Sequence, residues 1–149
     1  MSMREILFCG KRIDNGEWAE GSLLIDDHRN YYIGTYIPEY KPNTFVFSAR
    51  GMGKTINRFI GVGLVMVDPE TVGQYTGLTD TNGKKIFEGD IVKLQMPGYE
   101  MNGQIIFEEA TFYIMEDDVC EVLWYEEAKF EVIGNIHDNP ELLQGGSNE

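Results

Sequence analysis

Short runs of apolar and β-branched residues, separated by polar turn residues, dominate the chain, and this pattern is typical of β-strands rather than helices. Most runs end at glycine, asparagine, aspartate or proline, which favour turns. The pattern predicts strands over residues 6–9, 18–25, 31–36, 44–47, 60–67, 90–94, 104–107, 111–115, 120–124 and 130–136. We therefore expect a mainly β fold of the barrel or sandwich type.

Four short segments between these runs have sequences typical of particular turns. Residues 14–16 (Asp-Asn-Gly) and 80–83 (Asp-Thr-Asn-Gly) predict tight hairpins, because asparagine and glycine tolerate a positive φ. Asp68 and Asn139 each precede a proline, which is the usual opening of a helix, but neither pattern continues far. We expect a single helical turn at each of these two places.

The length of 149 residues suits a single domain or two tightly joined subdomains. We expect a small N-terminal β subdomain over residues 1–60, which is a possible oligomerisation element, and a second subdomain over residues 61–144. We expect residues 145–149 to form a frayed tail. The glycine-rich stretch 48–63 has no acidic residue and is either the joint between the subdomains or a long exposed hairpin.

The sequence predicts a cytoplasmic protein. Its first residues have no apolar run of signal-peptide length, and no stretch approaches the ~18 apolar residues that a membrane span requires. Cys9 and Cys120 are far apart and belong to no close pair, so we expect two reduced thiols.

Charge is divided unequally along the chain. The formal net charge of -13 opposes binding to phosphate backbones. Residues 1–60 carry eight Lys or Arg against seven Asp or Glu, whereas residues 61–149 carry four against eighteen. The two parts therefore differ sharply in the partners they can attract.

Residues 48–55 (Ser-Ala-Arg-Gly-Met-Gly-Lys-Thr) end like a phosphate-binding loop but lack its first glycine. Such a loop holds phosphates because a helix begins directly after it. Residues 56–63 contain two glycines and several strand formers, so they do not predict that helix. The next acid, Asp68, follows too closely for a parallel crossover of about a dozen residues or more. We therefore set nucleotide hydrolysis aside.

The sequence holds two histidines, His28 and His137, and each lies beside an aspartate. They are more than a hundred positions apart, so a surface or turn histidine explains each better than a shared metal site. Residues 80–83 resemble the start of a calcium loop, yet its third oxygen ligand is missing and Glu88 is one position short. We expect no bound metal.

No catalytic group stands out from the sequence. Nucleophilic catalysis requires Ser, Thr or Cys beside an oriented base, and Cys120 lies instead in a strand-like run. The acidic pairs at 108–109, 117–118 and 126–127 indicate loops or solvated edges, because adjacent strand residues point to opposite faces. We therefore expect a protein that is not an enzyme and that has no cofactor.

One stretch carries a pattern that nucleic-acid-binding proteins use. The cations Lys41, Arg50, Lys54 and Arg58 follow or alternate with aromatic residues between positions 31 and 47, as in single-strand binders. The alternative is a core with a few solubilising charges, which the negative field of the whole chain favours. The four cations are our candidate contacts for nucleic acid or a protein partner.

Several segments together resemble the YopX family of bacteriophage and prophage proteins. They are residues 4–8 (REILF), 11–18 (KRIDNGEW), 67–78 (VDPETVGQYTGL), 82–92 (NGKKIFEGDIV), 132–136 (VIGNI) and 139–142 (NPEL). The resemblance departs at residues 31–59 and 96–127. It implies a mainly β fold with a C-terminal SH3-like barrel and a smaller N-terminal β subdomain, and it implies no established activity.

From these patterns we expect a non-enzymatic phage accessory protein that acts through protein–protein contacts and forms a homo-oligomer. A near-neutral N-terminal part can dock on the acidic C-terminal part of a neighbour and so relieve self-repulsion. A host or phage protein is a possible further partner, and a membrane is not. The alternative is a nucleic-acid-related protein that either binds through residues 41–58 or mimics DNA through its acidic C-terminal part.

Overall fold

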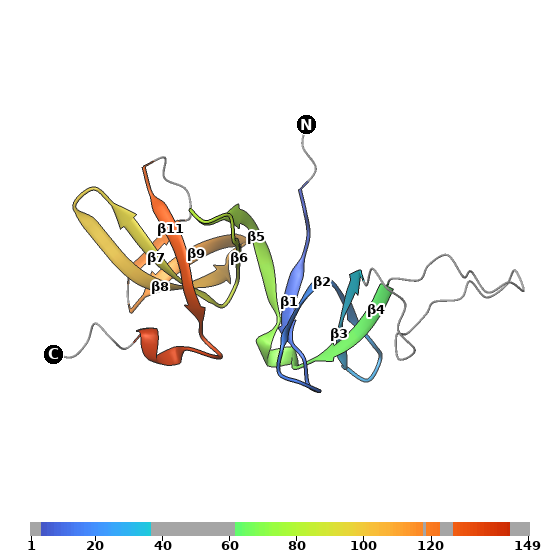
Figure 1. Ribbon diagram of the computed structural model, residues 1–149. Coiled ribbons are helices and arrows are strands. Elements are labelled where there is room, and N and C mark those ends of the chain that lie inside the picture. Colours follow the sequence, from blue (N-terminus) through green and yellow to red (C-terminus); the bar gives the residue numbers. More distant parts are fainter. Residues whose placement is uncertain (1–3, 37–61, 118, 123–126, 144–149) are drawn as a thin grey trace, which may run out of the picture. The chain divides into compact units, whose positions relative to one another are not determined.

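The computed structural model describes residues 4–36, 62–117, 119–122 and 127–143, which form strands and two 3-10 turns (Figure 1). The predicted mainly β fold is confirmed. Contacts divide the chain into two compact units. The N-terminal unit is Leu7–Val72, and the C-terminal unit is Gly73–Glu149 together with Met1–Ile6. The boundary expected from the sequence, between residues 60 and 61, lies outside the described residues.

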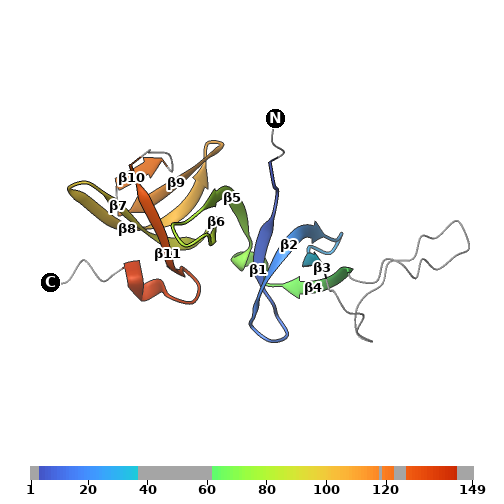
Figure 2. The ribbon, with the colours of Figure 1, turned by 45° about the horizontal axis from the view of Figure 1, so that its top comes forward.

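The N-terminal unit is an antiparallel sheet with the strand order β4-β3-β2-β1 (Figure 2). Its elements are β1 (Phe8–Lys11), β2 (Trp18–Ile25), β3 (Tyr31–Tyr36), β4 (Val62–Val67) and the 3-10 turn η1 (Pro69–Thr71). One bridge, between Arg12 and Val67, links the ends of β1 and β4. The N–H of Asp68 donates to the carbonyl of Lys11 at 2.9 Å beside this bridge.

Side chains alternate between the two faces of the N-terminal sheet along each strand, and one face is more buried than the other. Ile33 and Val67 on this face are fully buried. Gly21 lies against the neighbouring strand so closely that a Cβ would be 2.0 Å from the carbonyl oxygen of Gly34. A side chain at position 21 would therefore separate β2 from β3.

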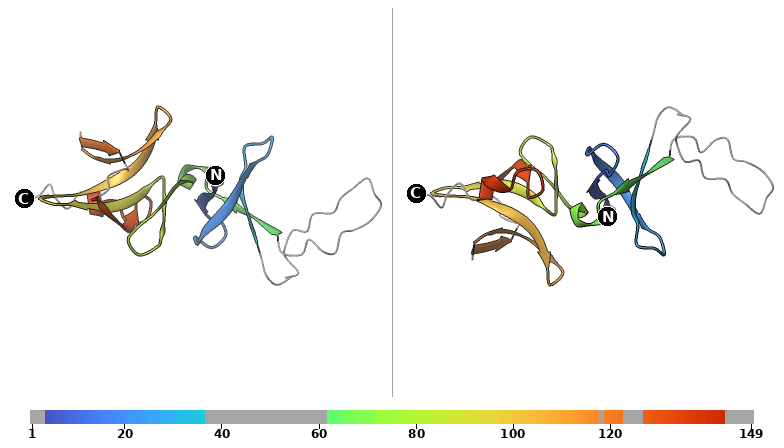
Figure 3. Two further views of the ribbon diagram at one scale, coloured as in Figure 1. Left: turned by 90° about the horizontal axis from the view of Figure 1, so that it is seen from above. Right: turned by 90° about the horizontal axis from the view of Figure 1, so that it is seen from below.

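The C-terminal unit contains a hairpin and a five-stranded antiparallel sheet with the order β10-β9-β8-β7-β11. The hairpin is β5 (Gly73–Thr79) and β6 (Lys85–Phe87), and the remaining elements are β7 (Asp90–Met96), β8 (Tyr99–Glu108), β9 (Thr111–Glu116), β10 (Val119–Val122), β11 (Lys129–Asn135) and the 3-10 turn η2 (Pro140–Leu143). The long strands, yellow to orange in Figure 3, are twisted, as antiparallel strands usually are.

Buried apolar side chains from several strands make the core of the C-terminal unit. They are Ile86, Val92, Leu94, Met101, Ile105 and Ile114. Strand pairing places Leu94 opposite Met101 and Ile105 opposite Ile114, so these pairs meet on one face of the sheet. The sheet of this unit does not close among the described strands, and the SH3-like barrel expected here therefore stays a prediction.

The four turns expected from the sequence are present. Residues 14–16 and 80–83 connect hairpin strands, and Gly16 and Gly83 have φ of 74° and 81°. Asp68 caps η1 by accepting a hydrogen bond from the N–H of Glu70 at 3.0 Å, and η2 begins at Pro140. The expected strand ranges did not include β5 and β6, which flank the predicted hairpin turn at residues 80–83. The strand expected over residues 44–47 lies outside the described residues.

Asp80 connects the β5–β6 turn to β11. Its Oδ1 accepts hydrogen bonds from the N–H groups of Asn82 and Lys84, both at 2.9 Å, and its Oδ2 accepts from the N–H of Val132 at 3.0 Å. Burial alone raises the pKa of this carboxyl, but the N–H donors and the charge of Lys84 outweigh burial and lower the pKa. The stabilisation by Asp80 is therefore present above its unfolded pKa of about 4 and is lost as the pH falls through its lower folded pKa.

Asp90 opens β7, and its pKa is shifted in the opposite direction. Burial raises the pKa of Asp90 to about 6, and the charge of Asp80 adds to the rise. The N–H of Phe87, which donates to Oδ2 at 2.8 Å, and the charge of Lys84 oppose the shift without cancelling it. Folding therefore favours the protonated acid, and this stabilisation is lost as the pH rises through about 6.

The hairpin between β8 and β9 has a two-residue turn whose backbone conformation is unfavourable for the residues that form it. Glu108 pairs with Thr111, and the turn residues Glu109 and Ala110 have φ of 49° and 65°. Two positive φ values are typical of a type I′ turn, which strongly prefers Asn-Gly.

We expect the double change Glu109→Asn and Ala110→Gly to raise the free energy of unfolding by about 1 kcal/mol, because it removes this backbone strain. Urea denaturation at pH 7 measures the change. Glu108→Asn serves as a control because it removes the same charge from the strand beside the turn, where φ is not positive. A double variant no more stable than this control would contradict the turn assignment.

We expect Asp90→Asn to raise the free energy of unfolding at pH 7 by about 2 kcal/mol, since a pKa shift of one unit corresponds to about 1.4 kcal/mol. The asparagine oxygen can still accept the N–H of Phe87. Asp90 should make the unmodified protein less stable as the pH rises from 4 to 7. The variant should not show this contribution. Urea denaturation across this pH range measures both effects.

Asp80→Asn is the matched comparison for Asp90→Asn. An amide nitrogen at position 80 cannot accept a hydrogen bond, so one N–H group beside it loses its partner and stability at pH 7 should fall. If the two substitutions change the free energy of unfolding at pH 7 equally, the pKa values of Asp80 and Asp90 are not shifted in opposite directions.

Candidate functional site

The four cations proposed from the sequence as partner contacts, Lys41, Arg50, Lys54 and Arg58, lie outside the described residues. So do residues 48–55, which resemble a phosphate-binding loop in part. Their roles stay predictions. The structure does place the two ends of the segment that carries them, because Tyr36 in β3 pairs directly with Val62 in β4. Residues 37–61 therefore leave and rejoin the sheet at neighbouring positions.

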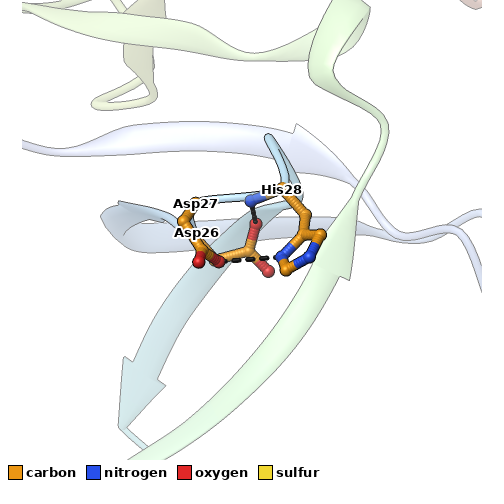
Figure 4. Close-up of side chains that lie close together, drawn as sticks. All are labelled: Asp26, Asp27 and His28. Carbon is orange, nitrogen blue, oxygen red and sulfur yellow. Dashed lines mark hydrogen bonds and ion pairs between the residues drawn. The ribbon is translucent and has the colours of Figure 1, made fainter.

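Asp26, Asp27 and His28 form the one group of potential metal-ligating side chains found among the described residues (Figure 4). They begin the loop between β2 and β3, whose last paired residues are Ile25 and Tyr31. One ligand atom from each side chain lies within 4.8 Å of the others. Carboxylate oxygens and an imidazole nitrogen are ligands that several divalent cations accept.

Asp26 uses its carboxylate to shape this loop. Its Oδ1 accepts hydrogen bonds from the N–H groups of His28 and Asn30 at 2.9 and 2.8 Å. Its Oδ2 accepts from the side-chain amide of Asn30 at 3.0 Å and from the hydroxyl of Tyr32 at 3.1 Å. The backbone and side-chain donors of Asn30 contribute most to lowering the pKa of Asp26. With four donors the carboxylate is saturated, so a cation would have to displace bonds that hold the loop.

The other two members of the group are exposed. Oδ1 of Asp27 lies 2.8 Å from Nδ1 of His28, and water reaches most of both side chains. An exposed contact of this kind contributes little to stability. We therefore interpret residues 26–28 as a surface turn stabilised by Asp26, in agreement with the sequence interpretation of His28.

His137 and the acidic pairs have local roles where the structure describes them. The N–H of His137 donates to Oδ1 of Asn135 at 2.9 Å, which shapes the turn after β11. Glu109 forms the β8–β9 turn, and Asp117, with φ of 50°, lies in the turn after β9. Asp118 and Glu126 lie outside the described residues.

Charge is the property that most clearly separates the two units. Residues 7–72 carry seven Lys or Arg against eight Asp or Glu, a net charge of -1. Residues 73–149 carry four against sixteen, a net charge of -12. The division of charge noted in the sequence therefore follows a division in the fold. An acidic unit of this kind attracts basic surfaces and repels copies of itself.

A search of the described part of the chain finds no helix long and apolar enough to cross a bilayer.

Comparison with known proteins gives one family. The model of the family described as YopX protein matches residues 14–144. A curated relative, the SPbeta prophage-derived uncharacterized protein YopX of Bacillus subtilis (strain 168), is 35% identical over 71 residues. That alignment covers 42% of this chain and 53% of the relative, so the chain matches about half the length of this protein.

Two crystal structures have the same fold. Protein yopX from Bacillus subtilis has a TM-score of 0.54 and 18% identity, and the match covers 94% of this chain and 98% of that one. Protein EF1440 from Enterococcus faecalis has a TM-score of 0.53 and 24% identity, covering 95% and 99%. At these identities the likeness establishes the fold alone. Since the family model also matches most of the sequence, the chain belongs to the YopX family.

Proposed function

We propose that this protein is a non-enzymatic accessory protein of a phage or prophage, and that it acts in the host cytoplasm through protein–protein contacts and self-assembly. The prophage origin of the Bacillus subtilis relative supports the setting. The observation that carries the proposal is the difference between the net charges of the two units, -1 and -12.

This difference favours contacts between unlike units of neighbouring copies. Two C-terminal units repel each other, whereas an N-terminal unit has little net charge and carries Lys41, Arg50, Lys54 and Arg58. Docking the N-terminal unit of one copy on the C-terminal unit of the next separates the acidic units and lets these four cations meet acidic side chains. Such a contact is head-to-tail, and it produces a ring if the rotation closes.

Nucleic-acid involvement is the second candidate function. Residues 37–61 hold four Lys or Arg against one acid, which supports direct binding of a single strand. The acidic C-terminal unit supports the other form, in which the protein mimics DNA and captures a basic host protein. Direct binding predicts affinity for free nucleic acid, whereas mimicry predicts none.

For self-assembly through unlike units, we expect an oligomer at low salt that dissociates as salt is raised, because salt screens charge contacts. Light scattering after size exclusion, at about 50 mM and 1 M NaCl over a concentration series, measures the mass. A monomer at every salt and protein concentration would exclude self-assembly.

For direct nucleic-acid binding, we expect residues 37–61 to be necessary. Replacing them by Asn-Gly should preserve the sheet, because Tyr36 and Val62 are paired and a two-residue turn can join them. Fluorescence anisotropy with a labelled single-stranded oligonucleotide should show salt-sensitive binding by the full chain and none by the shortened one.

The triple change Arg50→Ala, Lys54→Ala and Arg58→Ala tests the same cations without altering the chain length. Loss of oligonucleotide binding in both variants supports direct binding through these cations. If the full chain has no affinity for the oligonucleotide and captures a basic protein, mimicry replaces direct binding.

A further inference from the structure

The turn of the β5–β6 hairpin lies on the edge of β11. The N–H of Thr81 donates to the carbonyl of Phe130 at 2.9 Å, and Oδ2 of Asp80 accepts from the N–H of Val132 at 3.0 Å. Alternate residues of an antiparallel strand direct their backbone groups to opposite edges, so these two groups of β11 point away from β7. A neighbouring strand would donate to the first group and accept from the second. The turn therefore takes the place of a strand here.

The turn covers the regular part of the β11 edge. β11 pairs regularly with β7 from Lys129 to Val132, and its register then shifts before Gly134. A shift of this kind bends the strand and interrupts its ladder, so it ends the stretch to which another strand could pair in order. Uncovered edges of regular strands can pair with other chains. Two hydrogen bonds from the turn thus close the one regular stretch of this edge.

The turn is also held together by its own hydrogen bonds. The N–H of Asp80 donates to the carbonyl of Lys84 at 2.7 Å, and the N–H of Gly83 donates to the carbonyl of Asp80 at 3.0 Å. Oδ1 of Asp80 accepts from the N–H groups of Asn82 and Lys84. None of these four bonds involves β11, so the turn can keep its shape when it leaves the strand.

Little apolar burial holds the turn in place. Within Gly77–Lys84, Asp80 is the one buried residue, and the large apolar side chain of this stretch, Leu78, is 38% exposed. Burial begins again at Ile86 and Phe87, which are 0% and 6% exposed. Segments with few buried apolar contacts open at a lower free energy than the core of the same protein.

A break in the hairpin separates its exposed half from its buried half. Tyr75 pairs with Phe87, and the next pair is Thr79 with Lys85. Three residues of β5 therefore lie opposite one residue of β6 between these pairs. The middle one, Gly77, has φ of 91°, and a Cβ there would have no heavy atom within 4 Å beyond its chain neighbours. A glycine in such an uncrowded, irregular segment can change its backbone angles at little cost, so it can act as a hinge.

We propose that Gly77–Lys84 is a latch on the edge of β11, which opens as one unit about Gly77 while the five-stranded sheet stays folded, and which Asp80 holds closed. Opening breaks two hydrogen bonds to β11 and keeps the four within the turn, so it costs less than unfolding the sheet. The open form presents unpaired backbone groups, through which extended segments add to sheets. The latch therefore controls access to this edge.

Native-state hydrogen exchange of the full chain at pH 7, followed by NMR over a series of low urea concentrations, tests the latch. The amides of Thr81 and Val132 should exchange through one common opening that depends little on urea, because it exposes little surface. Gly89 and Ile136 are the reference amides, since they donate at 2.9 Å to the carbonyls of Ile105 and Gly89, outside the latch. Corrected for intrinsic rates, they should exchange about tenfold or more slowly and respond steeply to urea.

Two variants separate opening of the latch from unfolding of the unit. Ile114→Val weakens the buried cluster in the closed and open forms alike, so it should speed exchange of the reference amides and leave that of Thr81 and Val132 unchanged. Asp80→Asn can keep its oxygen toward the turn, which places its amide nitrogen against the N–H of Val132. Thr81 retains its own bond in this variant, and its amide should exchange about tenfold faster because the closed form is weakened.

A common opening of Thr81 and Val132 that Ile114→Val leaves unchanged and Asp80→Asn makes more frequent supports the latch. If these two amides exchange together with the reference amides, in the unmodified protein and in Ile114→Val, the turn opens only when the unit unfolds and the latch is wrong. Different opening free energies at Thr81 and Val132 would show that the two bonds break separately. Unchanged exchange of Thr81 in Asp80→Asn would show that Asp80 does not hold the latch. If Asp80→Asn fails to fold, the core variant still decides whether the latch opens by itself.

Discussion

The register of the antiparallel pairs is the constraint on which both units depend. A shift of one residue in any strand would exchange its buried and exposed faces, because side chains alternate with a period of two. In the C-terminal unit the register is fixed twice. The buried pair Ile105 and Ile114 sets it through packing, and Gly103 sets it sterically, since a Cβ there would lie 2.6 Å from Cγ1 of Ile114.

The same constraint gives the two units different properties. In the C-terminal sheet the buried face holds enough large side chains to form a contiguous cluster, so this unit can be both acidic and stable. In the N-terminal sheet Gly21 allows β2 to approach β3 closely, and neither Gly21 nor Gly34 contributes a side chain to a core. That unit is nearly neutral and has apolar side chains on its outer face. The two units therefore differ both in net charge and in the size of their buried core.

Local pattern predicted most of the described fold. Residues 18–25 and 31–36 form strands at the expected positions, and the Asp-Asn-Gly and Asp-Thr-Asn-Gly turns form because a positive φ is required there. The sequence did not reveal β5, which begins with glycine and has another at position 77, or β6, which has three residues. Pairing between neighbouring strands, rather than local preference, makes these two segments extended.

The candidate sites were harder to predict, since they depend on contacts between distant residues. Asp80 was recognisable as a turn residue, but its bond to Val132 joins positions 52 apart. The sequence drew attention to the aspartate beside His28, which is Asp27, whereas the loop conformation brings four donors to the carboxylate of Asp26. The exposed apolar residues Ile13, Leu24 and Met66 come from two strands and a turn, so only the paired sheet brings them together.

The pairing of Tyr36 with Val62 has an evolutionary consequence. The cost of closing a loop grows slowly with its length, by about 0.6 kcal/mol for each doubling. A chain that leaves and rejoins a sheet at paired positions can therefore gain, lose or exchange the residues between them while the sheet keeps its register. Selection can therefore alter the length and sequence of residues 37–61 independently of the scaffold, so a family with this sheet can vary at this position without changing its fold.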